Sequence, residues 1–573
     1  MIRTLVIELT LLVLVAACAR QIPPTGGDRD EIAPKVILTE PDNKSLNFSG
    51  QEITLEFDEY VKEDNLLKQL IITPRLNHEY KSRLVKRQLR LLFEQPFDSG
   101  TTYTLNFREG IKDITESNPA ENLKFVFSTG PYLDSLSIHG TVKNLLTGKP
   151  VKDATVSLYH ADDTLDVFNS QPTYLAKTSE AGVYAIDNIK NGSYRIFASK
   201  DENQNLKTES QSEAYGFKAA PINLQDSIPS VEIALQSLDI RSPKILSARP
   251  VNHSYEIKVN KFINDYSLST NDPNIALVSQ LVDNSRTIRI YKTATATTVD
   301  SVQAFIEVVD SAESRLTDTL YVKFTDSKRA LEKPTINITP ENNEAIDPEY
   351  KGKLVFNKPV EHFLGDSMFI QYDSINVIAI DPNLSLVWNA NRTEATLTTT
   401  LDPTLLASDT STSKATGPKL KQIGTKQAKK AATNLEFYFG TGSFISVEGD
   451  TFPKIERSYS FKKAGEYGVI AGNVLTEYTS FVIQLVDKNL KVLETLVSKP
   501  DNPIKNYRFD GLKPGDYGFR ILIDENQNGK WDYGNYLKQL EPEKIVFYVN
   551  PDNDGPTVNL IKNWELTQID LSF

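Results

Sequence analysis

Short runs in which apolar and polar residues alternate recur along this chain, whereas helical periodicity is scarce. The run Ile53-Thr54-Leu55-Glu56-Phe57 is one example, and Tyr103-Thr104-Leu105-Asn106-Phe107 is another. Because successive side chains of a strand point to opposite faces, each run predicts a strand with one buried face. Residues that favour turns separate the runs, as in antiparallel sandwiches. The pattern predicts an all-β chain built from tandem β-sandwiches.

The length of 573 residues is several times that of one sandwich. We therefore expect roughly four or five domains of about 100 to 150 residues each. The formal net charge of −12 opposes nucleic-acid binding, because a phosphate backbone requires a concentrated positive surface. A single cysteine leaves no disulfide framework, cysteine zinc site or iron–sulfur cluster.

The one cysteine, Cys18, follows a short apolar run from Leu5 to Ala17. That run is too short for a comfortable membrane span and instead indicates an export signal. The residues Val15-Ala16-Ala17-Cys18 resemble the lipobox of bacterial lipoproteins. The resemblance implies that residues 1–17 are a signal peptide and that the Cys18 thiol carries acyl chains such as palmitate. The alternative is an ordinary secretory signal with an incidental cysteine.

Residues 18–33 are rich in proline, glycine and charge, so we expect a flexible tether. The pattern Pro24-Thr25-Gly26-Gly27-Asp28 after the cysteine is similar to that of Bacteroidota lipoproteins, which implies anchoring in the outer membrane. Acidic residues, which often mark surface display in such proteins, are absent from Ala19-Arg20-Gln21-Ile22. We therefore favour the periplasmic face over the cell surface.

Residues 34–130 contain the expected strand from Leu55 to Val61 and a turn from Gly110 to Asp113. In these features the segment resembles the bacterial Ig-like domains of surface-layer and cell-envelope proteins. A similar order of strands returns in residues 331–463. Residues 239–330 are interpreted as a third, divergent Ig-like sandwich.

A second type of repeat is centred on a Gly148-Lys149-Pro150 turn between two expected strands. It resembles the transthyretin-like or carboxypeptidase-regulatory-like β-sandwich and covers residues 131–238. Residues 464–573 repeat its order, and both copies run into the pentapeptide Asp-Glu-Asn-Gln-Asn, at 201–205 and at 524–528. Identical pentapeptides at matched positions indicate an internal duplication.

The later pentapeptide begins a candidate calcium loop, with oxygen-bearing side chains at positions 1, 3, 5 and 9 and Gly529 at position 6. Asn535 stands at position 12 instead of a glutamate, so we expect weak binding. The alternative is a plain hairpin with Asn528-Gly529 as its type I′ turn. Leu206 replaces the glycine in the earlier copy, where we expect no metal. The candidate ligands are Asp524, Asn526, Asn528, the carbonyl of Lys530, and Asp532.

Residues 408–434 form a lysine-rich segment inside the Ig-like domain expected at residues 331–463. We expect a solvated loop there; the alternative is contact with anionic lipid or polymer. Its lysines are Lys414, Lys419, Lys421, Lys426, Lys429 and Lys430, opposed by Asp409.

No catalytic motif is recognisable: the sequence has no His-Glu-x-x-His pair, no Gly-x-Ser-x-Gly elbow and no phosphate-binding glycine loop. Our leading interpretation is a non-enzymatic, lipid-anchored envelope protein that acts as a spacer or docking subunit for another envelope protein. The first alternative is a glycan-binding or adhesive protein that uses Trp388, Trp531 and Trp564 as stacking surfaces. The second is a hydrolase, because a catalytic carboxylate pair is close only in space.

Overall fold

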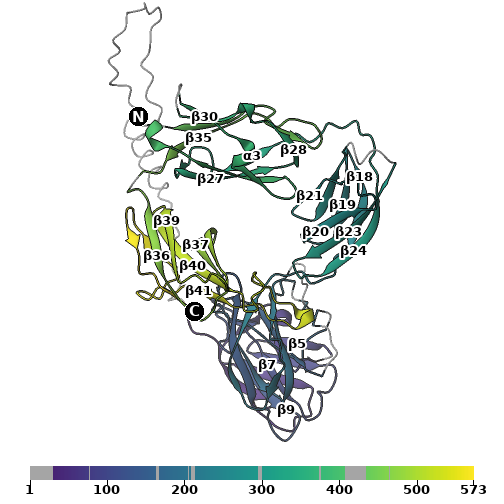
Figure 1. Cartoon of the computed structure of the whole chain (residues 1–573). Coiled ribbons are helices and arrows are strands. Elements are labelled where there is room, and N and C mark those ends of the chain that lie inside the picture. Colours follow the sequence, from purple (N-terminus) through teal and green to yellow (C-terminus); the bar gives the residue numbers. More distant parts are fainter. Residues whose placement is uncertain are drawn as a thin grey trace, which may run out of the picture. The chain divides into compact units, whose positions relative to one another are not determined.

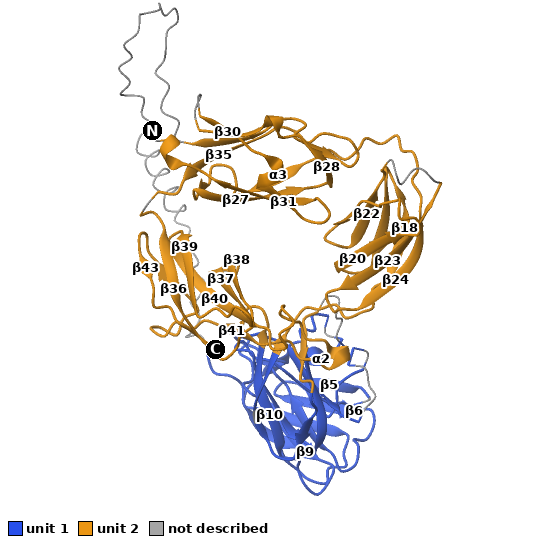
Figure 2. Ribbon diagram, viewed as in Figure 1, with its two compact units in different colours: residues 1–142, 150–207, 220–233 blue, residues 143–149, 208–219, 234–573 orange. Residues whose placement is uncertain are grey.

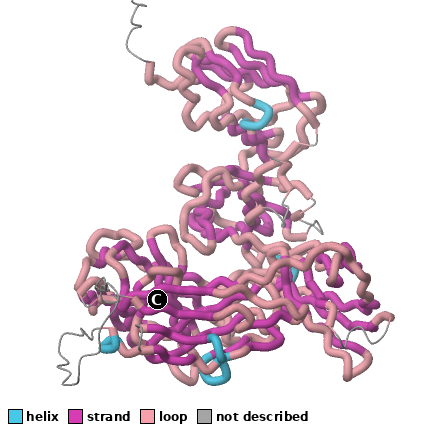
Figure 3. Tube along the Cα trace, turned by 90° about the horizontal axis from the view of Figure 1, so that it is seen from above, coloured by secondary structure: helices cyan, strands magenta, loops and turns pink. Residues whose placement is uncertain are grey.

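A computed structural model describes residues 30–76, 78–162, 167–168, 170–203, 205–207, 213–293, 300–372, 376–406, 434–463 and 465–573 (Figure 1). Strands dominate its regular structure, and helix occurs in short segments such as α2 (Leu66–Gln69) and α3 (Pro382–Ser385) (Figure 3). The prediction of an all-β chain of sandwiches is thereby confirmed. The signal peptide, Cys18 and the lysine-rich segment up to residue 433 lie outside the described ranges, so the predictions made for them remain predictions.

The chain divides into two compact units (Figure 2). Unit 1 comprises residues 1–142, 150–207 and 220–233, and unit 2 comprises residues 143–149, 208–219 and 234–573. Within the ranges that the structure describes, no helix is both long and apolar enough to cross a membrane.

The first Ig-like sandwich lies in unit 1 and has two main sheets. Alternate residues of β2, including Ile53, Leu55 and Phe57, are buried between them, as the sequence predicts. One sheet has the order β1 (Val36–Glu40), β2 (Glu52–Phe57), β6 (Gln88–Phe93) and β5 (Tyr80–Val85). The other has the order β4 (Ile71–Thr73), β7 (Thr102–Asn106) and β9 (Lys124–Ser128), and β3 (Val61–Glu63) pairs with β8 (Ile111–Asp113).

Strand β7 departs from the predicted alternation, because Thr102, Tyr103, Thr104 and Leu105 are all buried. The second face of β7 is covered by the following sandwich of unit 1, where the Thr104 hydroxyl donates to Asn188 Oδ1 at 3.1 Å. A strand whose two faces are both covered loses the polar face that alternation predicts.

Unit 2 contains the same strand order twice more. In residues 331–463, the sheet β25-β27-β32-β31 matches β1-β2-β6-β5, the strands β29, β33 and β35 match β4, β7 and β9, and β28 pairs with β34 as β3 does with β8. In residues 239–330, the sheets are β18-β19-β22-β21 and β20-β23-β24. The strands of residues 331–463 are β25 (Ile336–Thr339), β27 (Glu349–Phe356), β28 (Val360–Phe363), β29 (Met368–Gln371), β31 (Leu386–Trp388), β32 (Glu394–Thr400), β33 (Leu435–Phe439), β34 (Phe444–Ser446) and β35 (Ile455–Phe461), with β26 (Ala345–Ile346) and β30 (Val377–Ala379) at the edges. The strands of residues 239–330 are β18 (Ile245–Val251), β19 (Ser254–Val259), β20 (Ile263–Thr270), β21 (Ser279–Val282), β22 (Thr287–Tyr291), β23 (Val302–Asp310) and β24 (Arg315–Val322).

One local hydrogen bond recurs in all three Ig-like segments. In each segment, the residue after the second strand uses its side-chain oxygen to accept a hydrogen bond. The donor is the backbone N–H of the residue at the start of the first strand. The donor and acceptor pairs are Lys35 with Asp58 at 2.8 Å, Lys244 with Asn260 at 2.8 Å, and Thr335 with Asn357 at 2.7 Å. Residues 239–330 thus share this local contact, as well as their strand order, with the other two segments.

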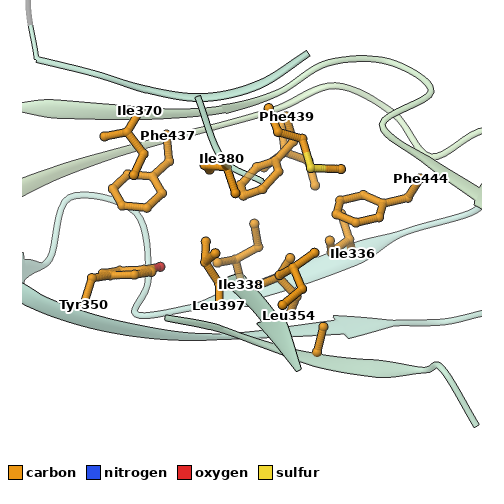
Figure 4. Close-up of a cluster of buried hydrophobic side chains, with 14 of the residues drawn as sticks. Ile336, Ile338, Tyr350, Leu354, Ile370, Ile380, Leu397, Phe437, Phe439 and Phe444 are labelled. Atoms are coloured by element: carbon orange, nitrogen blue, oxygen red, sulfur yellow. The ribbon is translucent and has the colours of Figure 1, made fainter. Parts of the chain in front are cut away.

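The core of residues 331–463 shows how such a sandwich is filled. Ile338, Leu354 and Leu397 come from one sheet and face Ile370 and Phe437 from the other (Figure 4). All five are almost completely buried, so two half-apolar sheets enclose one continuous core.

The two sandwiches of the second type also match each other. In each copy a tyrosine hydroxyl donates to the carbonyl four residues earlier, Tyr194 to Lys190 at 2.8 Å and Tyr517 to Lys513 at 2.5 Å. The first copy has sheets β13-β10-β17 and β12-β11-β14-β15, with β16 beside β14. Its strands are β10 (Leu136–Asn144), β11 (Thr155–His160), β12 (Tyr174–Lys177), β13 (Val183–Ile189), β14 (Gly192–Ser199), β15 (Tyr215–Phe217), β16 (Ile222–Leu224) and β17 (Ile228–Leu235). The second copy has β39-β36-β43 with β44 beside β36, and β38-β37-β40-β41 with β42 beside β40. Its strands are β36 (Gly468–Leu475), β37 (Phe481–Asp487), β38 (Val492–Ser498), β39 (Asn506–Leu512), β40 (Gly515–Ile523), β41 (Ile545–Phe547), β42 (Val558–Leu560), β43 (Glu565–Leu566) and β44 (Leu571–Ser572).

Candidate functional site

The candidate calcium loop lies in the connection between β40 and β41. Leu522 of β40 pairs with Ile545 of β41, so the chain leaves the sheet for more than 20 residues before it returns. Positive φ angles occur at Gln527 and Gly529, with values of 58° and 89°, and not at Asn528. The alternative of a two-residue hairpin with a type I′ Asn528-Gly529 turn is therefore wrong, because that turn requires strands on both sides and a positive φ at both residues.

Asp524 anchors the start of this loop. Its Oδ1 accepts the backbone N–H of Asn528 at 3.1 Å, and its Oδ2 accepts that of Gly529 at 2.9 Å. The Ser480 hydroxyl also donates to Oδ2 at 2.6 Å. Asp524 and Ser480 are both buried, so this carboxylate has exchanged water for three protein donors.

The two asparagines direct their amide nitrogens at Asp532. Asn526 Nδ2 donates to Asp532 Oδ2 at 2.9 Å, and Asn528 Nδ2 donates to the same oxygen at 2.5 Å. Their amide oxygens accept the backbone N–H groups of Asn528 and Lys530 at 2.9 and 3.0 Å. Partial burial raises the pKa of Asp532, but these amide hydrogen bonds and Lys530 outweigh that effect and hold the pKa below its ordinary value. Hydrogen bonds thus close the loop. For a metal ion to bind the amide oxygens of Asn526 and Asn528, both side chains would have to rotate away from their present hydrogen-bond partners.

Glu543, which sequence reasoning missed, holds the other side of the loop. Its two carboxylate oxygens accept the backbone N–H groups of Asn526 at 3.1 Å and Asp532 at 2.8 Å. Burial raises the pKa of Glu543, although these bonds oppose the shift. Trp531 Nε1 donates to the Glu543 carbonyl at 3.0 Å. No spacing rule points to Glu543, because it reaches the loop through the fold.

The earlier pentapeptide builds the same turn. Asp201 Oδ1 accepts the N–H of Asn205 at 3.1 Å, and its Oδ2 accepts that of Leu206 at 3.0 Å. Leu206 occupies the place of Gly529 with a φ of 60°, a left-handed conformation that is costly for leucine. The carboxylate cap is therefore strong enough to form without glycine.

Metal-binding and stacking groups are not gathered elsewhere in the described ranges. These contain no cluster of three or more histidine, cysteine or acidic side chains placed to hold a metal. Trp388 packs on Phe356 and Phe363 at ring-centroid distances of 5.3 and 5.9 Å, at the edge of the core. Trp531 is engaged in the loop, whereas Trp564, near β43, is 54% exposed. The three tryptophans thus belong to separate local structures.

The residues that the structure describes form a large cleft in each unit. The cleft of unit 2 has a volume of about 980 Å³, lies beside the Asp524 loop and includes eight carboxylates in its lining, among them Glu307 and Glu541. The cleft of unit 1 has a volume of about 1030 Å³ and is lined by several cations, among them Arg75 and Lys177. Both volumes suit a small ligand or a peptide segment.

Comparison with known domains supports both predicted module types. A bacterial Ig-like domain model matches residues 30–129, and a carboxypeptidase regulatory-like domain model matches residues 137–214. These matches confirm the two types of domain expected at the start of the chain. No curated protein matches the chain.

The chain is also similar to several solved structures, all at low sequence identity. Dimeric latent PorU from Porphyromonas gingivalis is 8% identical, with 52% of this chain and 34% of that chain covered and a TM-score of 0.23. The S-layer protein rSbsC(31-844) is 12% identical, with 91% and 68% covered and a TM-score of 0.14. The Bacteroides ovatus glucan-utilisation protein SGBP-B, solved with a mixed-linkage heptasaccharide, is 11% identical, with 66% and 85% covered and a TM-score of 0.15. The chain spans only about a third of PorU, and similarities this distant carry no inference about its function.

Proposed function

We propose that this chain is a non-enzymatic, lipid-anchored protein of the cell envelope that serves as a spacer or docking subunit for another envelope protein. The observation that carries the proposal is the use of its buried carboxylates. Asp524 and Glu543 bind backbone N–H groups, and so does Asp113, whose Oδ1 accepts the N–H groups of Glu116 and Ser117 at 2.7 and 2.8 Å. Groups committed to holding loops are not available for proton transfer.

Unit 1 supports a docking role because its two sandwiches are joined by charged contacts. Lys124 pairs with Asp187 at 2.6 Å, and Arg108 pairs with Asp153 at 2.7 Å. Together with the Thr104 to Asn188 hydrogen bond, these contacts fix one sandwich against the next. A fixed pair of sandwiches offers a partner a preorganised surface, which lowers the entropic cost of association.

The anchor is Cys18, and the location that fits it is the periplasmic face of the outer membrane. This part of the proposal rests on the lipobox-like residues before Cys18 and on the polar tether that follows. The glycan-binding alternative gains little support from the tryptophans, because only Trp564 among the three is largely exposed.

Chemical cross-linking in intact cells of the native host tests the docking role. We expect one defined envelope protein to be cross-linked to the full chain in near-stoichiometric amount, and to be lost when the chain is deleted. If the chain is cross-linked to no protein and instead binds neutral glycans in an array, the docking role is wrong and the glycan-binding alternative replaces it.

A further inference from the structure

The cleft of unit 1 contains cations whose charge the protein does not neutralise. It lies between the α2–β4 region of the Ig-like sandwich and the β12 edge of the following sandwich, and both regions belong to unit 1. Of its carboxylates, Asp153 pairs with Arg108, which also lines the cleft, Asp201 caps its own loop, and Glu202 follows Asp201 in that loop. Glu79 is exposed at the rim.

Arg75 is the clearest of these cations. Its backbone N–H donates to the Thr173 carbonyl at 2.9 Å, which fixes the residue at the cleft, yet within the described part of the chain its guanidinium has no hydrogen-bond acceptor and no ion-pair partner. Partial burial lowers the pKa of Arg75, and no neighbouring carboxylate offsets that shift. A half-desolvated, unpaired guanidinium reduces folding stability, and an anion bound in the cleft would relieve this cost.

Lys177 is a second such cation, at the end of β12. Its ammonium donates to the Thr155 hydroxyl at 2.5 Å, and among the described residues no carboxylate lies within ion-pair distance. Desolvation lowers the pKa of Lys177, with Arg108 and Lys200 adding to the effect, although Asp201 and Asp153 oppose it. Two poorly compensated cations that line one cleft, one from each sandwich, point to an anionic ligand.

The apolar lining narrows the class of ligand. The cleft contains seven aliphatic side chains and only two with rings, His78 and Tyr80, so it offers little of the stacking surface that sugars prefer. Strands β4 and β12, which both border it, are each the last strand of their sheet, and they contact each other near the Arg75 to Thr173 hydrogen bond, so only part of each edge is free. A free sheet edge binds extended peptides through main-chain hydrogen bonds. The aliphatic residues are Leu67, Leu70, Ile71, Ile72, Leu76, Leu175 and Leu206.

We propose that this cleft binds an extended, acidic and aliphatic segment of a partner protein, with Arg75 and Lys177 pairing with its carboxylates. This inference rests on the proposed docking role, because that role is the reason for expecting the ligand to be part of a protein.

A peptide-binding measurement with the purified full chain tests the proposal. The probe is a fluorescein-labelled peptide, Leu-Asp-Leu-Glu-Leu-Asp, and its control is the amide version, Leu-Asn-Leu-Gln-Leu-Asn. We expect saturable binding of the acidic peptide, weakened by added salt, and at least about tenfold weaker binding of the amide peptide. The substitutions Arg75→Gln and Lys177→Gln should each weaken binding of the acidic peptide by about tenfold or more. The control Arg83→Gln removes the same charge from an exposed position on β5 outside the cleft and should change affinity less than about twofold.

A thermal melt of Arg75→Gln separates a binding role from a structural one. Because the Arg75 guanidinium has no partner to lose, the melting temperature of the Arg75→Gln chain should equal or exceed that of the natural chain. A clear fall in the melting temperature would show that Arg75 has a structural role and would overturn the proposal. The proposal would also be overturned if both peptides bound equally well, or if Arg83→Gln weakened binding of the acidic peptide as much as Arg75→Gln does. It would likewise be overturned if the acidic peptide did not bind at a concentration of about 1 mM. Binding of oligogalacturonate instead of the peptide would assign the cleft to an acidic glycan and reject the protein partner.

The cross-linking experiment distinguishes failure of this proposal from failure of the docking role. If Arg75→Gln is cross-linked to the envelope partner as efficiently as the natural chain, docking stands and the cleft is not its site. If the natural chain is cross-linked to no partner while the acidic peptide still binds through Arg75, the chemistry of the cleft stands and the docking role fails.

Discussion

At the scale of single residues, aspartates at the ends of strands build the loops of this protein. Asp310 is the last residue of β23, much as Asp524 directly follows β40, and its Oδ1 accepts the backbone N–H groups of Ala312 and Ser314, both at 2.8 Å. Side chains that bind nearby backbone N–H groups compete with regular structure and fix turns instead. The same residue type also provides metal ligands, so the spacing of aspartates in sequence alone does not separate the two roles.

We propose that the Asp524 loop nonetheless binds calcium weakly. Its two loop carboxylates and neutral amides resemble the weak extracellular class, with dissociation constants of about 10⁻⁴ to 10⁻³ M. Calorimetric titration of the full chain with calcium should give such a constant. Asp532→Asn should abolish it, because that residue supplies a ligand and leaves the Asp524 cap intact.

The twin loop provides the control for this measurement. Asp201→Asn alters the equivalent cap of the earlier copy and should leave calcium binding unchanged. A natural chain that gives no heat of binding up to about 10 mM calcium, above the whole range of this class, would show that the loop is held by hydrogen bonds alone.

At the scale of elements, one glycine in each sandwich of the second type allows two backbone segments to cross closely. A Cβ atom on Gly140 of β10 would lie 1.9 Å from the Val231 carbonyl oxygen, and one on Gly472 of β36 would lie 2.0 Å from that of Ile569. Tyrosine hydroxyls bind the same two oxygens, Tyr184 at 3.0 Å and Tyr507 at 2.5 Å.

Gly140→Ala and Gly472→Ala should each destabilise their own sandwich by about 1 to 3 kcal/mol, because a methyl group at either position overlaps a backbone oxygen. Urea unfolding of the full chain should show an earlier transition for each variant. Gly515→Ala on β40 is the matched control, since the nearest atom to its Cβ would be 3.9 Å away, and it should unfold as the natural chain does. Unchanged unfolding of Gly140→Ala would contradict the close crossing.

A buried lysine fastens the segment before β18 to the middle Ig-like sandwich. Lys261 Nζ pairs with Asp310 Oδ2 at 2.6 Å and donates to the Arg241 carbonyl at 2.8 Å, and the side chains of Lys261 and Asp310 are 3% and 0% exposed. An ion pair buried this completely is costly to break from one side, because the remaining charge keeps no partner.

Lys261→Met should therefore destabilise the middle sandwich by about 3 to 5 kcal/mol. Thermal unfolding of the full chain measures the loss, and Lys258→Met, at an exposed position on β19, should change it little. If the two variants unfold alike, the Lys261 pair contributes no more than a surface charge.

At the scale of the whole molecule, three Ig-like segments of one strand order and two sandwiches of a second type account for the described ranges from residue 34 onward. In unit 2, Gln236 forms a paired contact with Gly534: its Nε2 donates to the Gly534 carbonyl at 2.6 Å, and its Oε1 accepts the Gly534 N–H at 3.0 Å. Polar contacts of this kind join neighbouring segments, and the sandwiches of residues 34–130, 239–330, 331–463 and 464–573 each have a buried core of their own.

Cys18→Ser tests the membrane anchor of the whole chain. It should abolish labelling by radioactive palmitate and release the chain from the membrane fraction, because the acyl chains are the anchor we propose. Ala19→Ser is the control and should leave both labelling and sedimentation unchanged. Persistence of Cys18→Ser in washed membranes, with no protein partner holding it there, would reject the lipid anchor.

Local features of the chain sufficed to predict its strands and its class. Alternation of side chains along five or six residues depends only on the backbone geometry of a strand, so Ile53, Leu55 and Phe57 could be placed in the core from the sequence. The duplicated pentapeptide likewise located two equivalent turns. These inferences hold because each concerns residues that are neighbours along the chain.

Contacts between distant residues could not be predicted in this way. Both faces of β7 are buried because Asn188 and its sandwich cover the second one, and Glu543 completes the Asp524 loop from beyond it. The cleft that contains Arg75 and Lys177 exists only because the folded chain brings together segments about 100 residues apart. Such sites depend on packing and desolvation in three dimensions, and neither quantity is encoded in the spacing of residues along a sequence.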